Sequence, residues 1–313
     1  MKIFHDPEEI KDLSRTVVTT GSFDGVHIGH KAILNRLQNL ARKIDGESVL
    51  ITFHPHPRKI LFPETAGKNL FLINSQQEKI ELLKKTGLDN LLIINFTPEF
   101  SRMSSFNFIR KILVAKLNAK KVIVGFNNHF GHKQEGGYEV LYELGKYHDF
   151  EVEEIPEQDI ENETVSSTRI RKALLEGKIQ RANAYLDHYY MIIGTTEQIF
   201  LSGVESKLPV YHVSIDEDCK LIPPEGTYAV SIKIENNAYK GLIYIENREQ
   251  TGYTQNIGRY VVLIPLEEFE LANHRLIKIY FHKMIREIHQ TNTKIPLNEI
   301  LTNDKPIVEE LIF

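Results

Sequence analysis

One segment of ten residues, 21–30, limits what this chain can fold into more than any other feature. It follows the β-branched run at 16–20 and precedes a stretch in which apolar residues recur at helical spacing from Ala32 to Leu40. The pattern predicts a strand, a tight glycine turn and the N-terminus of a helix. Such an N-terminus offers unpaired N–H groups and the positive end of the helix dipole, which together suit a phosphate.

Two histidines stand at the start of this predicted helix. His27 and His30 are three residues apart, so their imidazoles lie on the same face of one turn and can address one polyphosphate. A single histidine near a helix start is usually an ordinary surface residue. A pair separated by Gly29 after a glycine-flanked turn favours the phosphate-binding interpretation.

The composition is that of an ordinary globular protein. The 313 residues leave room for about two domains, and 42% of them are hydrophobic and 26% charged. A net charge of −4 gives no basic surface for nucleic acid, and no apolar run has the length of a membrane-spanning helix. A single cysteine excludes an intrachain disulfide, and the first residues contain no signal-peptide core. We therefore expect a cytoplasmic protein that does not bind a membrane.

Strands and helices alternate up to about residue 185. This order predicts a Rossmann-like α/β domain with a parallel sheet covered on both faces, whose ligand lies at the carboxyl ends of the strands, where residues 21–30 fall. The expected strands are 16–20, 48–53, 90–95, 121–124 and 151–155, and the expected helices are 31–44, 76–86, 105–116, 138–148 and 167–176.

The second part of the chain has a different pattern. Segments 227–234, 241–246, 259–266 and 275–281 are expected to be strands separated by turns, followed by a helix at 297–311. This predicts an antiparallel β-barrel with a C-terminal helix. The expected domains are residues 1–185 and 186–313, with the junction within 183–194.

Three further segments of the first half carry polar groups. Residues 53–58 place His54, His56 and Arg58 in alternation with two prolines, which is compatible with an anion-facing loop and equally with a solvated one. Residues 122–131 end a strand in a glycine-flanked loop; His129 and His132 have the spacing of a metal pair, but without a nearby Cys or carboxylate ligand set they are better explained as loop residues.

The third segment, residues 165–171, opens a helix. Its serines and threonine suit an N-cap, which is an adequate structural explanation by itself. Arg171, however, follows Ser167 by one turn on the same face, and a guanidinium binds phosphate oxygens with two parallel hydrogen bonds. The segment therefore also suits a polyphosphate.

Together these segments resemble the nucleotidyltransferase superfamily and, more narrowly, the bacterial FAD synthetases, which join an FMN adenylyltransferase module to a riboflavin kinase module. Residues 21–30 are similar to the signature Gly-x-Phe-Asp-Gly-Val-His-x-Gly-His, 53–57 to Phe-x-Pro-His-Pro, 124–131 to Val-Gly-x-[Asn/Asp]-x-x-Phe-Gly, and 166–171 to Ser-Ser-Thr-x-Ile-Arg. Asn128 stands where the family more commonly has an aromatic residue.

The resemblance implies that AMP is transferred from ATP to FMN, giving FAD and pyrophosphate with Mg²⁺ present. It assigns catalysis to His27, His30 and Arg171. Its ATP-binding residues are Gly21, Ser22, Phe23, Asp24, Gly29, Ser167 and Thr168, and its FMN-binding residues are His56, Pro57 and Asn127. Asp24 is a candidate for organising the turn or for magnesium, and the magnesium ligands stay open.

The second half resembles the riboflavin kinase barrel in its Pro-x-Gly-x-Tyr-Ala-Val segment at 224–230 and its Asn-Ile-Gly segment at 256–258. It departs from the family where Val210 and His212 replace the Thr and Asn of Gly-x-Pro-Thr-Ala-Asn. The strand at 259–264, where the family has its catalytic glutamate, contains no carboxylate. Since Mg²⁺ prefers oxygen ligands, we expect the kinase activity to be lost.

Three alternatives to an FMN adenylyltransferase with a degenerate kinase barrel stay open. In the first, the chain is a bifunctional enzyme that also phosphorylates riboflavin. In the second, it is a non-catalytic regulatory paralogue that binds flavin or nucleotide. In the third, it is a nucleotidyltransferase acting on another phosphorylated acceptor. The intact His27, His30 and Arg171 weigh against the second of these.

Overall fold

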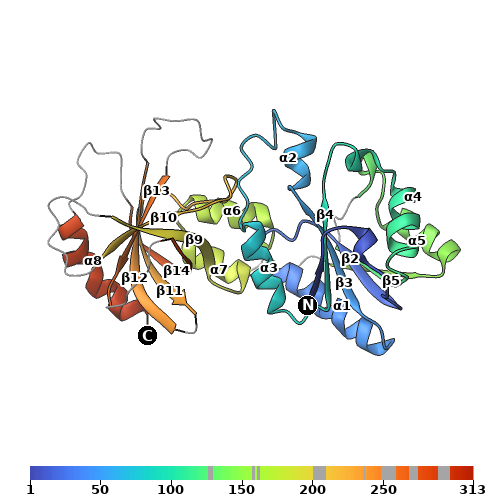
Figure 1. Ribbon diagram of the computed structural model, residues 1–313, viewed down its shortest axis with the longest axis horizontal. Helices are drawn as coiled ribbons and strands as arrows, with labels where there is room; N and C mark the ends of the chain where they lie inside the picture. Colours follow the sequence, from blue (N-terminus) through green and yellow to red (C-terminus); the bar gives the residue numbers. More distant parts are fainter. Residues whose placement is uncertain are drawn as a thin grey trace. The chain divides into compact units, whose positions relative to one another are not determined.

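The computed structural model describes residues 1–125, 130–156, 159–160, 163–199, 209–235, 237–247, 259–267, 274–287 and 297–312. The chain forms two compact units (Figure 1). The first contains Met1–Leu70 and Lys79–Val165, and the second contains Phe71–Glu78 and Ser166–Phe313. Among the described residues, no helix has the length and apolar character needed to cross a membrane.

The first unit is built on a six-stranded sheet in which every neighbouring pair is parallel. Its order is β1-β4-β3-β2-β5-β6. The strands are β1 (Lys2–Phe4), β2 (Thr16–Thr20), β3 (Ser48–His54), β4 (Asn90–Asn95), β5 (Ala119–Gly125) and β6 (Glu151–Ile155). The central strands are nearly continuous runs of Val, Ile, Leu and Thr, as expected for strands buried on both faces.

Helical segments connect these strands. They are η1 (Pro7–Glu9), α1 (Ile28–Lys43), α2 (Pro57–Leu61), α3 (Gln76–Lys84, of which the residues up to Glu78 belong to the second unit), η2 (Phe100–Arg102), α4 (Ser105–Phe108), η3 (Ile109–Val114), η4 (His132–Gln134) and α5 (Tyr138–His148), with the short strands β7 (Asp159–Ile160) and β8 (Glu163–Thr164) near the end of the unit. The single helix expected at 105–116 is instead one α-helical turn followed by the π-helical η3.

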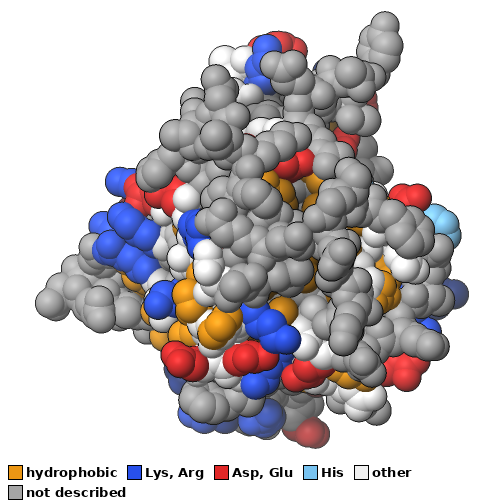
Figure 2. All heavy atoms as spheres, turned by 90° about the vertical axis from the view of Figure 1, so that its left-hand side faces the viewer, with side chains coloured by type: hydrophobic (Ala, Val, Ile, Leu, Met, Phe, Trp, Pro, Cys, Tyr) orange, Lys and Arg blue, Asp and Glu red, His pale blue; other side chains and the backbone are white. Residues whose placement is uncertain are grey.

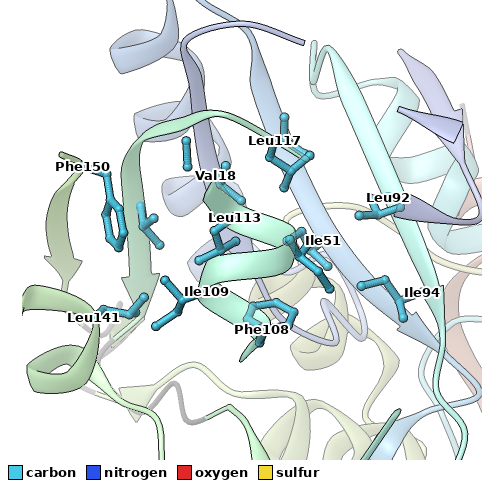
Figure 3. Close-up of a cluster of buried hydrophobic side chains, with 14 of the residues drawn as sticks. Val18, Ile51, Leu92, Ile94, Phe108, Ile109, Leu113, Leu117, Leu141 and Phe150 are labelled. Carbon is cyan, nitrogen blue, oxygen red and sulfur yellow. The ribbon is translucent and has the colours of Figure 1, made fainter. Parts of the chain in front are cut away.

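The core on one face of the sheet is a cluster of buried side chains (Figure 3). Phe108, Ile109 and Leu113 pack there against Val18 and Ile51. Their strand neighbours Val17 and Leu50 are equally buried but lie outside this cluster, as do the buried residues of α1. Since successive strand residues face opposite sides, the sheet is covered on both faces, as predicted.

The second unit contains a closed antiparallel barrel with the order β10-β13-β12-β11-β14-β9. Its elements are α6 (Ser167–Leu175), α7 (Ile179–Leu186), β9 (Tyr190–Ile199), β10 (Val210–Ser214), β11 (Gly226–Ile234), β12 (Asn237–Asn247), β13 (Arg259–Pro265), β14 (Arg275–Glu287) and α8 (Leu297–Leu311). Val308 of α8 packs in one cluster with Val210, Ala229 and Leu242 of the barrel. The predicted fold class, a Rossmann-like domain followed by a barrel and a C-terminal helix, is confirmed.

A buried ion pair lies inside the second unit. Lys220 and Glu78 are fully buried, and their charged atoms are 2.6 Å apart. The Lys220 ammonium also donates to the carbonyls of Ile73 and Met191, while Glu78 accepts the Ile193 N–H. Because every charged group here has hydrogen-bond partners, the pair ties the segment Phe71–Glu78 to β9 without leaving an uncompensated charge.

On the face drawn in Figure 2, charged side chains of both signs are interspersed with small hydrophobic patches.

Candidate active site

The segment between β2 and α1 is a strained, buried turn. The backbone has positive φ angles at Phe23 (49°), Gly25 (94°) and Val26 (41°). Of these three residues, only the glycine adopts such an angle without steric cost. The turn is held at its start by the Gly21 N–H, which donates to the Ile51 carbonyl at 3.0 Å. Strain of this kind is found where the backbone must take one particular shape, as at a ligand site.

The Ser22 carbonyl lies at the centre of this turn. It accepts hydrogen bonds from the Thr52 hydroxyl at 3.2 Å and from the Lys79 ammonium at 3.0 Å. Thr52 belongs to β3 and Lys79 to α3, so two different elements fix one peptide of the turn.

The two histidines begin α1 as predicted. His27 is the N-cap residue, and its ring stacks on that of His30 with centroids 3.7 Å apart and planes 19° apart. The Phe23 ring stacks on His30 with a centroid distance of 4.5 Å. A Cβ at Gly29 would lie only 3.2 Å from the His27 ring, so the glycine between the histidines permits their stacking.

The electrostatics of the pair differ from those of exposed histidines. Burial lowers the pKa of His30 well below its usual value, and the neighbouring His27 and Lys79 lower it further. His30 Nδ1 is buried and has no hydrogen-bond partner in the described part of the chain. A buried imidazole with an unused nitrogen at a helix N-terminus is suited to binding a polar ligand.

A cavity of about 340 Å³ adjoins the turn. Its walls come from the carboxyl ends of β2 and β3 and from the segments that follow β2, β3, β4 and β5, and include Thr20, Gly21, Ser22, Phe53, His56, Pro57, Arg58, Phe96, Phe100, Met103, Phe108 and Phe130. Phe53, Phe96 and Phe100 are in mutual contact, with centroids 5.5–6.1 Å apart. An aromatic wall with polar groups at one side suits a flat, largely apolar ring that carries a polar tail.

Most residues predicted for the site from the first unit are therefore brought together. Gly21, Ser22, Phe23, Asp24, His27, Gly29 and His30 form the turn and the start of α1, and His56 and Pro57 line the adjoining cavity. The His56 ring accepts the Arg58 N–H at 3.2 Å, which caps α2. Asn127 lies outside the described residues.

The predicted phosphate-binding segment of α6 belongs to the second unit. The Ser166 hydroxyl caps this helix by accepting the Arg169 N–H, so the expected N-cap is present one residue before Ser167. That Ser167, Thr168 and Arg171 bind the same nucleotide as His27 and His30 stays a prediction.

Among the described residues, no three of His, Cys, Asp and Glu lie close enough together to hold a metal ion. Asp24 is the carboxylate of the turn and is almost fully buried. This donor set fits an ion held chiefly by substrate phosphates, which is how Mg²⁺ usually accompanies a nucleotide.

Two features of the site were not predicted from the sequence. Lys79 was expected only as part of a helix. Its burial is the signal that its ammonium has a partner, since lysine is almost never fully buried unless it is paired. The phenylalanines Phe96, Phe100 and Phe108 come from separate segments, and only the fold shows that they share one cavity.

In the barrel, the positions that depart from the kinase pattern have apolar and aromatic surroundings. Val210 is 5% exposed and packs in the cluster of α8, while His212 stacks on Tyr260 with centroids 4.5 Å apart. A cavity of about 200 Å³ is lined by His212, Lys220 and Arg259 together with apolar residues. Residues 256–258 lie outside the described part.

Comparison with known proteins gives matches along nearly the whole chain. The FAD synthetase family model matches residues 9–169 and the riboflavin kinase model matches residues 186–312. The bifunctional riboflavin kinase/FMN adenylyltransferase of Buchnera aphidicola subsp. Schizaphis graminum is 32% identical over 314 residues, covering 99% of this chain and 98% of the relative. The protein of the same name from Bacillus subtilis is 28% identical, covering 97% and 95%.

A solved structure has the same fold. The crystal structure of a macrolide-efflux protein from Streptococcus pneumoniae matches with a TM-score of 0.84 and covers 98% of both chains. At 23% sequence identity this match shows the fold alone.

Proposed function

The chain belongs to the FAD synthetase family, and we propose that it transfers AMP from ATP to FMN, producing FAD and pyrophosphate. The observation that carries this proposal is the stacked pair His27 and His30 at the N-terminus of α1, beside a cavity walled by phenylalanines. The helix start suits the triphosphate, and the aromatic cavity suits the flavin ring.

The reaction needs no covalent intermediate on the protein. An oxygen of the FMN phosphate forms a bond to the α-phosphorus of ATP, the bond from that phosphorus to the bridging oxygen breaks, and pyrophosphate leaves with the bonding electrons. The chain's contribution is to hold both substrates in line and to stabilise the charge that develops on the phosphate oxygens.

The proposed roles follow from the positions of the residues. His27 and His30 bind the triphosphate and the transition state at the start of α1, with Gly21, Ser22, Phe23, Asp24 and Gly29 shaping the turn. His56, Pro57 and Asn127 bind FMN, and Arg171 with Ser167 and Thr168 holds the departing phosphates. Mg²⁺, when bound through the substrate phosphates, neutralises part of their charge. In functional terms we assign adenylyl transfer to residues 1–185, and we place the protein in the cytoplasm.

The test is a direct assay. Purified protein is incubated with FMN, Mg-ATP and pyrophosphatase, and the flavins are separated by chromatography; a parallel reaction contains EDTA. FAD formation that stops with EDTA is the expected result. No FAD at saturating substrates would instead favour a flavin- or nucleotide-binding protein without this activity.

Phosphorylation of riboflavin by residues 186–313 is the second candidate function. The riboflavin kinase match over residues 186–312 and the names of the relatives favour it, and neither supports the expectation that the activity is lost. What opposes it is the chemistry of three positions: the Val210 side chain offers no oxygen, His212 is stacked on Tyr260, and strand β13 carries no carboxylate.

We therefore propose that the barrel binds flavin or nucleotide but phosphorylates riboflavin weakly or not at all. The same preparation is incubated with riboflavin and Mg-ATP in place of FMN. Because any FMN formed is converted onward to FAD, the readout is the sum of FMN and FAD made from riboflavin. Little of this sum is expected beside normal FAD formation from added FMN. A sum that grows at a rate similar to FAD formation from added FMN would show that the barrel is an active kinase, with metal ligands other than those of the family pattern.

A further inference from the structure

Lys79 is a buried cation close to the proposed adenylyl-transfer site. It lies on α3, is 5% exposed, and its ammonium donates to the Ser22 carbonyl at 3.0 Å. A lysine loses its hydration on burial and is retained in a protein interior only where it has partners. Its carbonyl partner belongs to the turn that precedes the two histidines, so the cation has a specific place in that turn.

The hydrogen bond from Lys79 to Ser22 affects His30 through the Ser22–Phe23 peptide and the Phe23 ring. Lys79 and Thr52 together fix the direction of the Ser22 carbonyl, and a planar trans peptide then fixes the N–H of Phe23 in the opposite direction. Phe23 has the strained φ of 49°, and its ring stacks on His30. The orientation of the Ser22 peptide therefore bears directly on the placement of His30.

The charge of Lys79 also acts on the same imidazole. Its ammonium and the neighbouring His27 both lower the pKa of His30, in addition to the larger effect of burial. His27, at the start of α1, and Lys79, on α3, are the titratable groups that act on His30 in the described part of the chain. A fixed positive charge behind a phosphate site also attracts the substrate anion.

We propose that Lys79 is a positioning residue for adenylyl transfer: from α3 it holds the Ser22 peptide, and through Phe23 it keeps His30 in place against the triphosphate. The proposal rests on the proposed function of FAD synthesis. It assigns no contact with substrate to Lys79, so loss of this residue acts on turnover rather than on FMN affinity.

The experiment compares four variants of the full-length chain. Lys79→Met removes the charge and the hydrogen bond, Lys79→Gln removes the charge but keeps a donor, and Lys79→Arg keeps both. Lys84→Met, at an exposed lysine of the same helix, is the matched control. Rates of FAD formation are measured against FMN and ATP, folding is followed by circular dichroism, and the His30 ring is titrated by NMR.

For Lys79→Met we expect kcat to fall by about tenfold or more, since small displacements of positioning groups have effects of this size, while KM for FMN stays nearly constant. The titration midpoint of His30 should rise in Lys79→Met and in Lys79→Gln, because a positive charge is gone. Lys79→Arg should recover part of kcat, and Lys84→Met should resemble the parent.

Four results would overturn the proposal. The first two are a folded Lys79→Met with unchanged kcat, and a rise in its KM for FMN with kcat unchanged. The others are an unchanged His30 midpoint in the variants, and failure of both Lys79→Met and Lys79→Gln to fold, which would make the lysine merely structural. If the parent itself forms no FAD, the proposed function fails. The His30 titration in the variants then still decides whether Lys79 controls this imidazole.

Discussion

The imidazole rings of His27 and His30 stack face to face, with centroids 3.7 Å apart. Two imidazolium ions at this distance would repel each other strongly, so positive charge on both rings at once is disfavoured. His30 is the member whose pKa is lowered, by burial first and then by His27 and Lys79. The pair thus brings two imidazoles together at a helix N-terminus, where the proposed chemistry needs them to bind the triphosphate.

Replacing His27 or His30 by alanine should lower turnover without unfolding the protein. Each change removes a group that stabilises developing phosphate charge, so we expect the activation free energy to rise by about 2.7–4 kcal/mol, by analogy with the loss of one oxyanion-hole donor. Initial rates of FAD formation measure this, with the exposed His5→Ala as control. Parent-like rates in both variants would place the site elsewhere.

Gly29→Ala tests the close packing of the pair. The added Cβ would lie 3.2 Å from Cε1 and 3.3 Å from Nδ1 of His27, so this ring must shift by a few tenths of an ångström. Alanine also favours the helix by about 1 kcal/mol relative to glycine, so the melting temperature should be unchanged or higher. We expect kcat to fall by about tenfold in spite of this stability, as for other small misplacements of catalytic groups. A variant that is both stable and fully active would show that the spacing of the rings is unimportant.

The lowered pKa of His30 predicts how stability depends on pH. The unfolded chain takes up a proton at this residue near pH 6.5, whereas the folded chain does so only at lower pH. The unfolded state therefore binds more protons in that interval, and the free energy of unfolding should decrease as the pH falls below about 6.5. His282, whose pKa burial also lowers, acts in the same direction in the second unit.

The measurement is urea denaturation of the parent and of His30→Gln at a series of pH values from about pH 7.5 downward through the unfolded-state pKa of histidine. The variant should lose less stability on acidification, because one group with a shifted pKa is gone. Equal pH dependence in the two proteins would mean that His30 titrates normally in the folded state.

The sequence predicted the parts of the fold that follow from local pattern. Strands β2, β4 and β6, and the helices α5 and α8, begin and end where the apolar pattern indicates. Strand β1 was missed because three residues are too few to show a periodicity. Helix α2 and strand β10 were missed because they lie in segments that were interpreted as a proline-containing loop and as the kinase motif. Strand β9 and helix α7 were missed because both lie in the region that was interpreted as a domain junction.

For the candidate site, the signature residues were predictable and their supports were not. The spacing of His27 and His30 places both at a helix start whatever the rest of the fold does. That Lys79 reaches the Ser22 carbonyl depends on how α3 packs, and that Phe96 and Phe108 share a wall depends on the strand order. Neither tertiary relationship leaves a periodic signal in the sequence.

The last prediction concerns Asp304 of α8, which is 1% exposed and accepts hydrogen bonds from the Thr227 hydroxyl at 2.7 Å and from Arg286 at 2.9 Å. Asp304→Ala would remove this acceptor from the buried Thr227 hydroxyl and this carboxylate partner from Arg286. We expect a loss of about 3 kcal/mol, at the lower end of the range for breaking a buried ion pair, because the Arg286 side chain is 31% exposed and regains some hydration. Chemical denaturation followed by circular dichroism measures the loss.

Glu309→Ala is the control, since that carboxylate lies on the same helix in an exposed pair with Lys305 and should contribute less than about 0.5 kcal/mol. Equal stability of the two variants would mean that α8 is held by apolar packing around Val308 alone, and the Asp304 contacts would then have no measurable role in anchoring it to the barrel.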